Sequence, residues 1–171
     1  YLGAVSVNAG TLKLGSATAL GATNGGTTIA SGATLDLGGF TQSAERITVG
    51  GAGQNSTGAV INTGAALVNT GLNGPITLTG DTTFGGVNRW DVFGGSLAGG
   101  GFKLTKTGAP EIALSNLRDT GLGSIEVQAG QLTILGSTLM GDPSRAATVR
   151  SNAALAYWAT GTNIHNKPII M

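Results

Sequence analysis

Short stretches in which hydrophobic and polar residues alternate recur along the whole chain. Such alternation places successive side chains on opposite faces and is typical of a β-strand with one buried face. Between the stretches lie Gly, Asn, Asp, Ser and Thr, which favour tight turns. No apolar stripe with helical spacing interrupts the pattern, so the sequence predicts an all-β protein. The alternating stretches are 5–7, 12–14, 35–37, 47–49, 76–78, 102–104, 112–114, 125–127, 132–134 and 155–157.

Two copies of one long unit frame the chain. Residues 1–15 align with 121–135 at an offset of 120, with identical Leu, Gly, Val, Ala, Gly and Leu positions, and residues 25–37 align with 145–157 at the same offset. We therefore divide the chain into repeat copies 1–49 and 121–171 and a less regular middle, 50–100. A repeat of this kind must be explained before the individual strands are interpreted.

A shorter period of 20–23 residues runs inside each copy. Apolar positions recur at this spacing, and a Gly or Asn lies at the corner between them (Gly10, Gly32, Gly130 and Asn152). Strands this short bury an apolar face only by stacking, which favours a β-solenoid. We predict a right-handed parallel β-helix of about 7–8 coils of 20–24 residues. Its inward columns would be Val7, Ile29, Val127 and Val149, and Leu12, Leu35, Leu132 and Leu155.

An antiparallel sandwich or jelly roll also consists of many short strands joined by glycine turns. It gives no reason for the equal spacings of Val7 to Ile29 and of Val127 to Val149. The solenoid further predicts an outward pair. If 102–104 aligns with 125–127, Lys103 lies beside Glu126 on the solvent face, as an exposed pair that contributes a few tenths of a kcal/mol.

Composition excludes several function classes. The chain has 31 Gly among 171 residues, 10% charged residues, no Cys and a net charge of +1. This is too glycine-rich and charge-poor for an ordinary helical enzyme, and it leaves no disulfide framework and no basic surface for nucleic acid. No apolar run is long enough for a membrane-spanning helix. The chain begins inside the repeat pattern without a signal peptide, so we expect residues 1–171 to be one solenoid segment of a longer repetitive protein.

The stretch 103–134 resembles the autotransporter-associated β-strand repeat, also called the passenger-associated transport repeat. The resemblance lies in LTKTGAPEIALS (104–115) and IEVQAGQLTI (125–134), and VSVNAGTLKL (5–14) is similar to the second half of the repeat. Pro110 and Glu111, and the turn 116–121, depart from the family pattern. The resemblance implies a right-handed parallel β-helix in a secreted or bacterial cell-surface protein, with a stalk-like or adhesive role. It implies no catalytic residues.

Parallel β-helices also include polysaccharide lyases and hydrolases, which need clustered carboxylates on one outer face. Among eight carboxylates, the best cluster is Arg118 and Asp119 with Asp142 and Arg145, because the two aspartates are 23 residues apart. Both segments are glycine-flanked turns, where solvated Asp and Arg are common. The lone histidine, His165, lies in a similar turn. We expect no enzyme activity, no cofactor and no metal centre, and calcium at Asp81 or Asp119 has no supporting motif.

Two groups of residues remain as candidate contacts. Arg89, Trp90, Asp91 and Phe93, together with Phe84, form the densest aromatic and charged patch, which would either contact a glycan or partner or fill a wide coil of the core. Tyr1, Leu2, Ile169, Ile170 and Met171 lie at the two chain ends, where open sheet edges favour stacking of further copies. The sequence thus favours a structural or adhesive extracellular module, with a carbohydrate-active enzyme or a glycan-binding module as alternatives.

Overall fold

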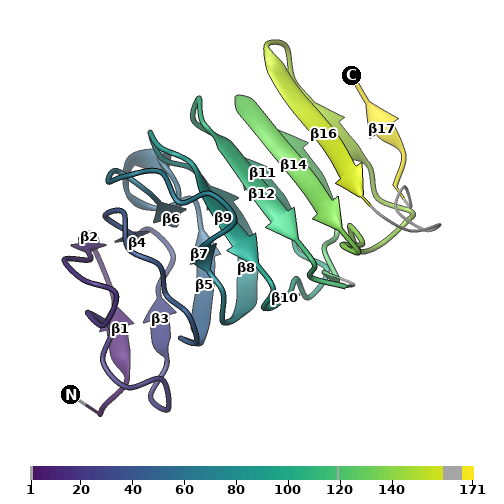
Figure 1. Ribbon diagram of the computed structural model, residues 1–171. Coiled ribbons are helices and arrows are strands. Elements are labelled where there is room, and N and C mark those ends of the chain that lie inside the picture. Colours follow the sequence, from purple (N-terminus) through teal and green to yellow (C-terminus); the bar gives the residue numbers. More distant parts are fainter. Residues whose placement is uncertain (1, 119, 160–166) are drawn as a thin grey trace.

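The computed structural model describes residues 2–118, 120–159 and 167–171 and shows a parallel β-solenoid of about seven turns. Successive turns stack along one axis, and the N- and C-terminal ends of the chain lie at opposite ends of the stack (Figure 1). Every strand pairing between the described strands is parallel. The predicted fold class is therefore confirmed, and the antiparallel sandwich is excluded.

The strands form three columns, in each of which strands from successive turns pair side by side. The first column contains β1 (Val5–Val7), β3 (Thr27–Ile29), β5 (Ile47–Gly51), the first part of β8 (Pro75–Phe84) and β10 (Ser96–Ala98). The second contains β2 (Thr11–Lys13), β4 (Thr34–Asp36), β6 (Val60–Ile61), the end of β8, β11 (Leu104–Lys106), β13 (Ile125–Val127), β15 (Ala147–Val149) and β17 (Ile169–Ile170). The third contains β7 (Gly71–Leu72), β9 (Trp90–Phe93), β12 (Glu111–Ser115), β14 (Gly130–Gly136) and β16 (Ala153–Ala159).

Alternation within the strands builds the core between the columns. Val7, Ile29, Val127 and Val149 are buried, as are Leu35 and Leu132, whereas Leu12 and Leu155 are partly buried against the same core. Both partly buried leucines belong to strands at the ends of the stack, where fewer neighbouring turns cover them. One short 3₁₀ turn, η1 (Gln54–Ser56), interrupts the strands. In the described part of the chain, no helix has the length and apolar character needed to cross a membrane.

The predicted corners are confirmed by the backbone. Gly10, Gly32, Gly130 and Asn152 all have positive φ, at 73°, 87°, 63° and 63°. This left-handed region is free of strain for Gly and accessible to Asn, but it disfavours most other residues. The corners therefore explain why a Gly or Asn recurs between the two apolar positions of each repeat.

The predicted pairings within each repeat copy are also confirmed. Val7 pairs with Ile29 and Leu12 with Leu35, whereas in the C-terminal copy Val127 pairs with Val149 and Leu132 with Leu155. The single period of 22 or 23 residues in the sequence is thus the length of one turn. Each column prediction is correct within its own copy.

The prediction that both copies share the same columns is wrong. Leu12 stacks through Leu35, Val60, Phe84 and Lys106 onto Val127, so Val127 continues the column of Leu12 rather than that of Val7. Leu132 accordingly lies in the third column, on Ile112 and beneath Leu155. The two copies are equivalent in sequence but are displaced by one column around the solenoid.

The irregular middle accounts for this displacement. Strand β8 pairs with β5 and β10 through residues 75–78 and with β6 and β11 through residues 82–84, and thus belongs to two columns. Its register against β5 shifts between Val49 and Gly51, where β8 holds extra residues. A glycine corner can join either pair of adjacent columns. After β8, which spans two columns, the repeat motif continues the stack one column further on.

The predicted pair between Lys103 and Glu126 is present, although its register is corrected. Thr105, not Lys103, is the backbone partner of Glu126, so the strands are offset by two residues from the expected alignment. The Lys103 Nζ still lies 3.5 Å from the Glu126 carboxylate, because residues diagonal to one another on one face remain within reach of long side chains. Arg150 also binds this carboxylate at 2.7 Å, and its hydrogen bond is the main cause that lowers the pKa of Glu126.

The Lys103 pair is expected to contribute little to stability. Its ammonium is substantially exposed and screened, and Arg150 forms a separate ion pair with the same Glu126 carboxylate. The variant Lys103→Met should change the free energy of unfolding by no more than a few tenths of a kcal/mol, roughly 0.5 at most. Urea denaturation followed by circular dichroism tests this, and a loss several times larger would show that the pair has a structural role.

Candidate functional site

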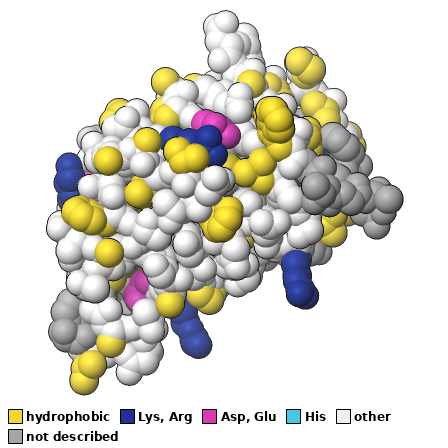
Figure 2. Space-filling model, viewed as in Figure 1, with side chains coloured by type: hydrophobic (Ala, Val, Ile, Leu, Met, Phe, Trp, Pro, Cys, Tyr) yellow, Lys and Arg dark blue, Asp and Glu magenta, His cyan; other side chains and the backbone are white. Residues whose placement is uncertain are grey.

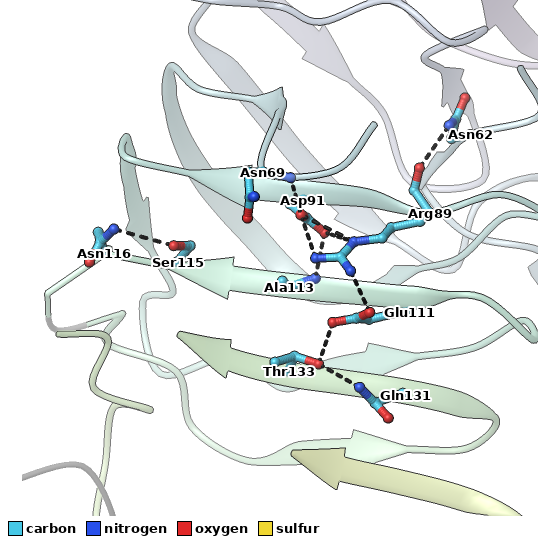
Figure 3. A network of polar contacts seen from close by, with 10 residues as sticks. All are labelled: Asn62, Asn69, Arg89, Asp91, Glu111, Ala113, Ser115, Asn116, Gln131 and Thr133. Atoms are coloured by element: carbon cyan, nitrogen blue, oxygen red, sulfur yellow. Dashed lines mark hydrogen bonds and ion pairs between the residues drawn. The ribbon is translucent and has the colours of Figure 1, made fainter. Parts of the chain in front are cut away.

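A ladder of charged and polar side chains crosses the outer face of the third column (Figure 3). In β9 and β12 the inward positions are apolar, so Asp91 and Glu111 belong to the opposite face. Arg89, just before β9, binds both carboxylates: its Nη2 lies 3.0 Å from Asp91 and its Nη1 lies 2.5 Å from Glu111. One guanidinium thus joins two successive turns of the solenoid.

Asp91 is the buried anchor of this ladder. Its carboxylate is fully buried and accepts backbone N–H groups from Asn69 at 2.7 Å and from Ala113 at 3.0 Å, besides the Arg89 guanidinium. Partial burial alone would lower the pKa of Arg89, but the hydrogen bond and charge of Asp91, with the charge of Glu111, raise it above its ordinary value. The arginine is therefore permanently charged and held in one orientation.

The ladder continues onto β14 through hydroxyl and amide groups. The Thr133 hydroxyl donates to Glu111 Oε1 at 2.7 Å and accepts from the Gln131 side-chain amide at 2.9 Å. Gln131 and Glu111 are directly paired across the two strands, as are Thr133 and Ala113. Each polar side chain in this row is consequently oriented by a neighbour before any ligand arrives.

These side chains line a groove of about 340 Å³ on the outer face. Apolar residues flank the polar ladder at both ends: Val68 precedes β7 at one side, and Leu135 and Trp158 lie on β14 and β16 at the other. Trp158 is 73% exposed, an unusual environment for so large an apolar side chain. The lining residues are Val68, Asn69, Arg89, Glu111, Gln131, Thr133, Leu135 and Trp158.

The structure separates the predicted aromatic patch. Trp90 and Phe84 are buried and pack edge to face, with ring centroids 5.1 Å apart, and the Trp90 indole N–H donates to the Gly85 carbonyl. A buried ring offers no face to a glycan, so Trp90 fills the core, as the alternative interpretation held. Arg89 belongs to the groove and Asp91 supports it from below, whereas Phe93 is partly buried on the outward face, paired with Ser115.

Sequence reasoning missed Glu111, Gln131, Thr133 and Trp158 as members of one site. A signal existed, because Glu111 and Thr133 occupy outward positions of successive turns, and adjacent strand residues such as Tyr157 and Trp158 point in opposite directions. Tyr157 does pack against the core while Trp158 is exposed. The predicted pairing of Leu132 with Leu155 gives the register of β14 against β16, but grouping Glu111 with these residues also requires the register of β12.

The candidate catalytic cluster is a local turn in the part that the structure describes. Asp142 lies 4.0 Å from Arg145 and accepts hydrogen bonds from the Ser144 backbone and hydroxyl, which lower the pKa of Asp142. Arg118 adopts positive φ in its own turn. Asp119 and His165 lie outside the described residues. Asp81 accepts the Lys103 backbone N–H, and the described residues contain no group of His, Cys, Asp and Glu suited to a metal ion.

The predicted stacking residues lie at the two ends of the solenoid. Leu2 is strongly exposed beside the first turn, and Ile169, Ile170 and Met171 are exposed in and after β17. Tyr1 lies outside the described residues. Charged side chains are sparse and scattered over the face seen in Figure 2, in keeping with the low charge of the sequence.

Comparison with known proteins gives no relative for this arrangement. No family model, no curated protein and no solved structure matches the chain. The resemblance to the autotransporter-associated repeat therefore stays a sequence-based prediction, and the fold and the groove rest on the chain's own structure.

Proposed function

We propose that this chain is a structural or adhesive module of an extracellular or bacterial cell-surface β-solenoid, forming a segment of a stalk or fibre. The observation that carries the proposal is the second column, which continues from β2 to β17 through every turn. One uninterrupted parallel sheet makes the segment a rod whose length grows with the number of turns. The resemblance of 103–134 to a passenger repeat supports a surface location.

The proposal assigns no catalytic step to the chain. The carboxylates of the groove are held by Arg89 and Thr133, and Asp142 is engaged by Ser144 and Arg145 within its own turn. A general acid and base that act across a glycosidic bond need two carboxyl groups free to face a substrate from opposite sides. The chemistry of these groups therefore favours a scaffold.

Association between copies of this segment is part of the same proposal. Among the described strands, β1 and β2 at one end and β16 and β17 at the other pair with a neighbour on one side only. Such edges pair readily with strands of another chain, and Ile169 and Ile170 leave apolar surface exposed beside them. A second copy would cover both the backbone edge and this apolar surface.

The 171-residue chain is accordingly expected to form concentration-dependent linear oligomers. Sedimentation velocity and negative-stain electron microscopy should show rods that lengthen as protein concentration rises. The variant Ile170→Lys should shift the population towards monomer, because a charge on an edge strand opposes pairing. Val87→Lys is the matched control, since Val87 is also exposed but lies in a loop between β8 and β9. A monodisperse monomer at all concentrations would contradict the association.

A further inference from the structure

We propose that the groove over the third column binds an uncharged oligosaccharide, with one sugar ring against Trp158 and its hydroxyls on the polar ladder. This proposal names the ligand class for the adhesive role, and it rests on the proposed function for that role. It is separable from end-to-end association, because the groove lies over the inner strands β12 and β14, and only Trp158 among its lining residues belongs to the end strand β16.

The groove has the construction of a preformed binding site. Its deepest lining residue is Thr133, which is almost fully buried, whereas Arg89 and Glu111 keep about a quarter of their side-chain surface exposed. The volume of about 340 Å³ lies within the usual range for small-ligand sites, which runs from about 300 to 1,000 Å³. Since the ladder is already ordered by its own hydrogen bonds, little side-chain freedom would be lost on binding.

The charges of the groove argue against an acidic ligand. Arg89 is the one cation among the lining residues, and Asp91 and Glu111 already bind it. The cluster of one guanidinium and two carboxylates carries a net charge of −1, so an anionic polysaccharide would meet repulsion and no available cation. Hydroxyl groups fit better, because the Glu111 carboxylate, the Gln131 amide and Asn69 offer both acceptors and donors.

The apolar flanks fit the faces of sugar rings. Trp158 presents an exposed aromatic surface, and its strand partner Leu135 is also part of the groove. Val68 is exposed at the other end, beside β7. The third column from β7 to β16 comprises five strands and hence spans about 19 Å at a spacing of about 4.8 Å. That length suits a short chain of sugars more than a single monosaccharide.

Tryptophan fluorescence offers a direct test, because the chain has two tryptophans and only Trp158 is exposed. The probes are cellohexaose, maltohexaose and hexa-N-acetylchitohexaose as uncharged chains, and hexagalacturonate as an acidic chain of the same length. We expect at least one uncharged hexasaccharide to protect Trp158 from acrylamide quenching in a saturable manner. Isothermal titration should give the same affinity, and hexagalacturonate should bind at least about tenfold more weakly.

Variants assign the binding to the groove. Trp158→Ala and Gln131→Ala should each weaken binding by about tenfold or more. Calorimetry measures the affinity of Trp158→Ala, because this variant lacks the fluorescent probe. Thr77→Val is the control, since Thr77 is exposed on β8 in the first column. Circular dichroism verifies that each variant is folded.

Three outcomes would overturn the inference: no saturable binding of any uncharged probe at millimolar concentration, preferential binding of hexagalacturonate, or unchanged affinity in Trp158→Ala. Failure of these binding tests with intact linear association would reject the glycan groove alone. Failure of association with intact binding would reject the fibre alone.

Discussion

Replacing Trp90 with alanine is expected to lower the free energy of unfolding by about 3–5 kcal/mol. Trp90 is fully buried in the third column, where it stacks on Ile112 and packs edge to face with Phe84. Its indole N–H also satisfies the buried Gly85 carbonyl at 2.8 Å. The substitution therefore creates a large cavity and leaves a backbone acceptor without its partner, two costs that act in the same direction.

The second tryptophan provides the matched control. Trp158→Ala removes the same side chain from an exposed position, so the free energy of unfolding should change by about 0.5 kcal/mol or less. Urea denaturation of both variants, followed by far-UV circular dichroism, measures the difference in unfolding free energy. Equal losses in the two variants would contradict the assignment of one ring to the core and the other to the surface.

Lys106 is the second position at which a large effect is expected. It occupies an inward position of the second column, between Phe84 and Val127, and its side chain is fully buried. The ammonium donates to three backbone carbonyls, of Thr107 at 2.9 Å, Gly108 at 2.7 Å and Ala129 at 2.9 Å. The Lys106 ammonium thus connects the corner at Thr107 and Gly108 with the following turn at Ala129.

The variant Lys106→Met should lower the free energy of unfolding by about 3 kcal/mol, because it retains most of the apolar stem but leaves buried carbonyls without donors. Lys103→Met, three residues earlier and exposed, removes the same charge from the same segment and serves as the control. A loss at Lys106 no larger than that at Lys103 would show that the three carbonyl contacts do not stabilise the fold.

The stability supplied by Lys106 should also depend on pH. Burial lowers the pKa of Lys106 to about 8, whereas an unfolded lysine titrates near about 10.4. Between these values the unfolded chain binds more protons than the folded chain, so stability rises with pH in this window. The difference in unfolding free energy between the unsubstituted chain and Lys106→Met should therefore increase from pH 7.5 to pH 10. A difference that falls over this range would contradict the lowered pKa.

Much of the fold could be predicted from spacing alone. A parallel stack repeats its inward side chains once per turn, so the 22- and 23-residue intervals revealed the partners Val7 and Ile29 as well as Leu132 and Leu155. The displacement of the copies by one column could not be predicted. Gly10 and Gly130 form similar positive-φ corners, and such a corner does not specify which two columns it joins. That information lies in β8, where no repeat is visible.

The candidate site was only partly accessible to sequence reasoning. Arg89 and Asp91 were singled out only as members of an aromatic and charged patch, and Trp90 between them points to the other face because strand side chains alternate. Lys106 was not singled out at all. A lysine at an inward position is stable only if carbonyl groups from its own corner and from the following turn converge on it, and the residues of that turn lie more than 20 positions away.

The distance from β2 to β15 along the second column tests the stacking of the solenoid most directly. Strands β2 and β15 are separated by the successive pairings β2–β4, β4–β6, β6–β8, β8–β11, β11–β13 and β13–β15. Because the chain has no cysteine, Thr11→Cys and Thr148→Cys can carry spin labels for pulsed electron–electron double resonance. Stacked parallel strands predict one narrow distribution centred near about 29 Å, six steps of about 4.8 Å each. A much shorter mean distance, as in two packed antiparallel sheets, would contradict the solenoid.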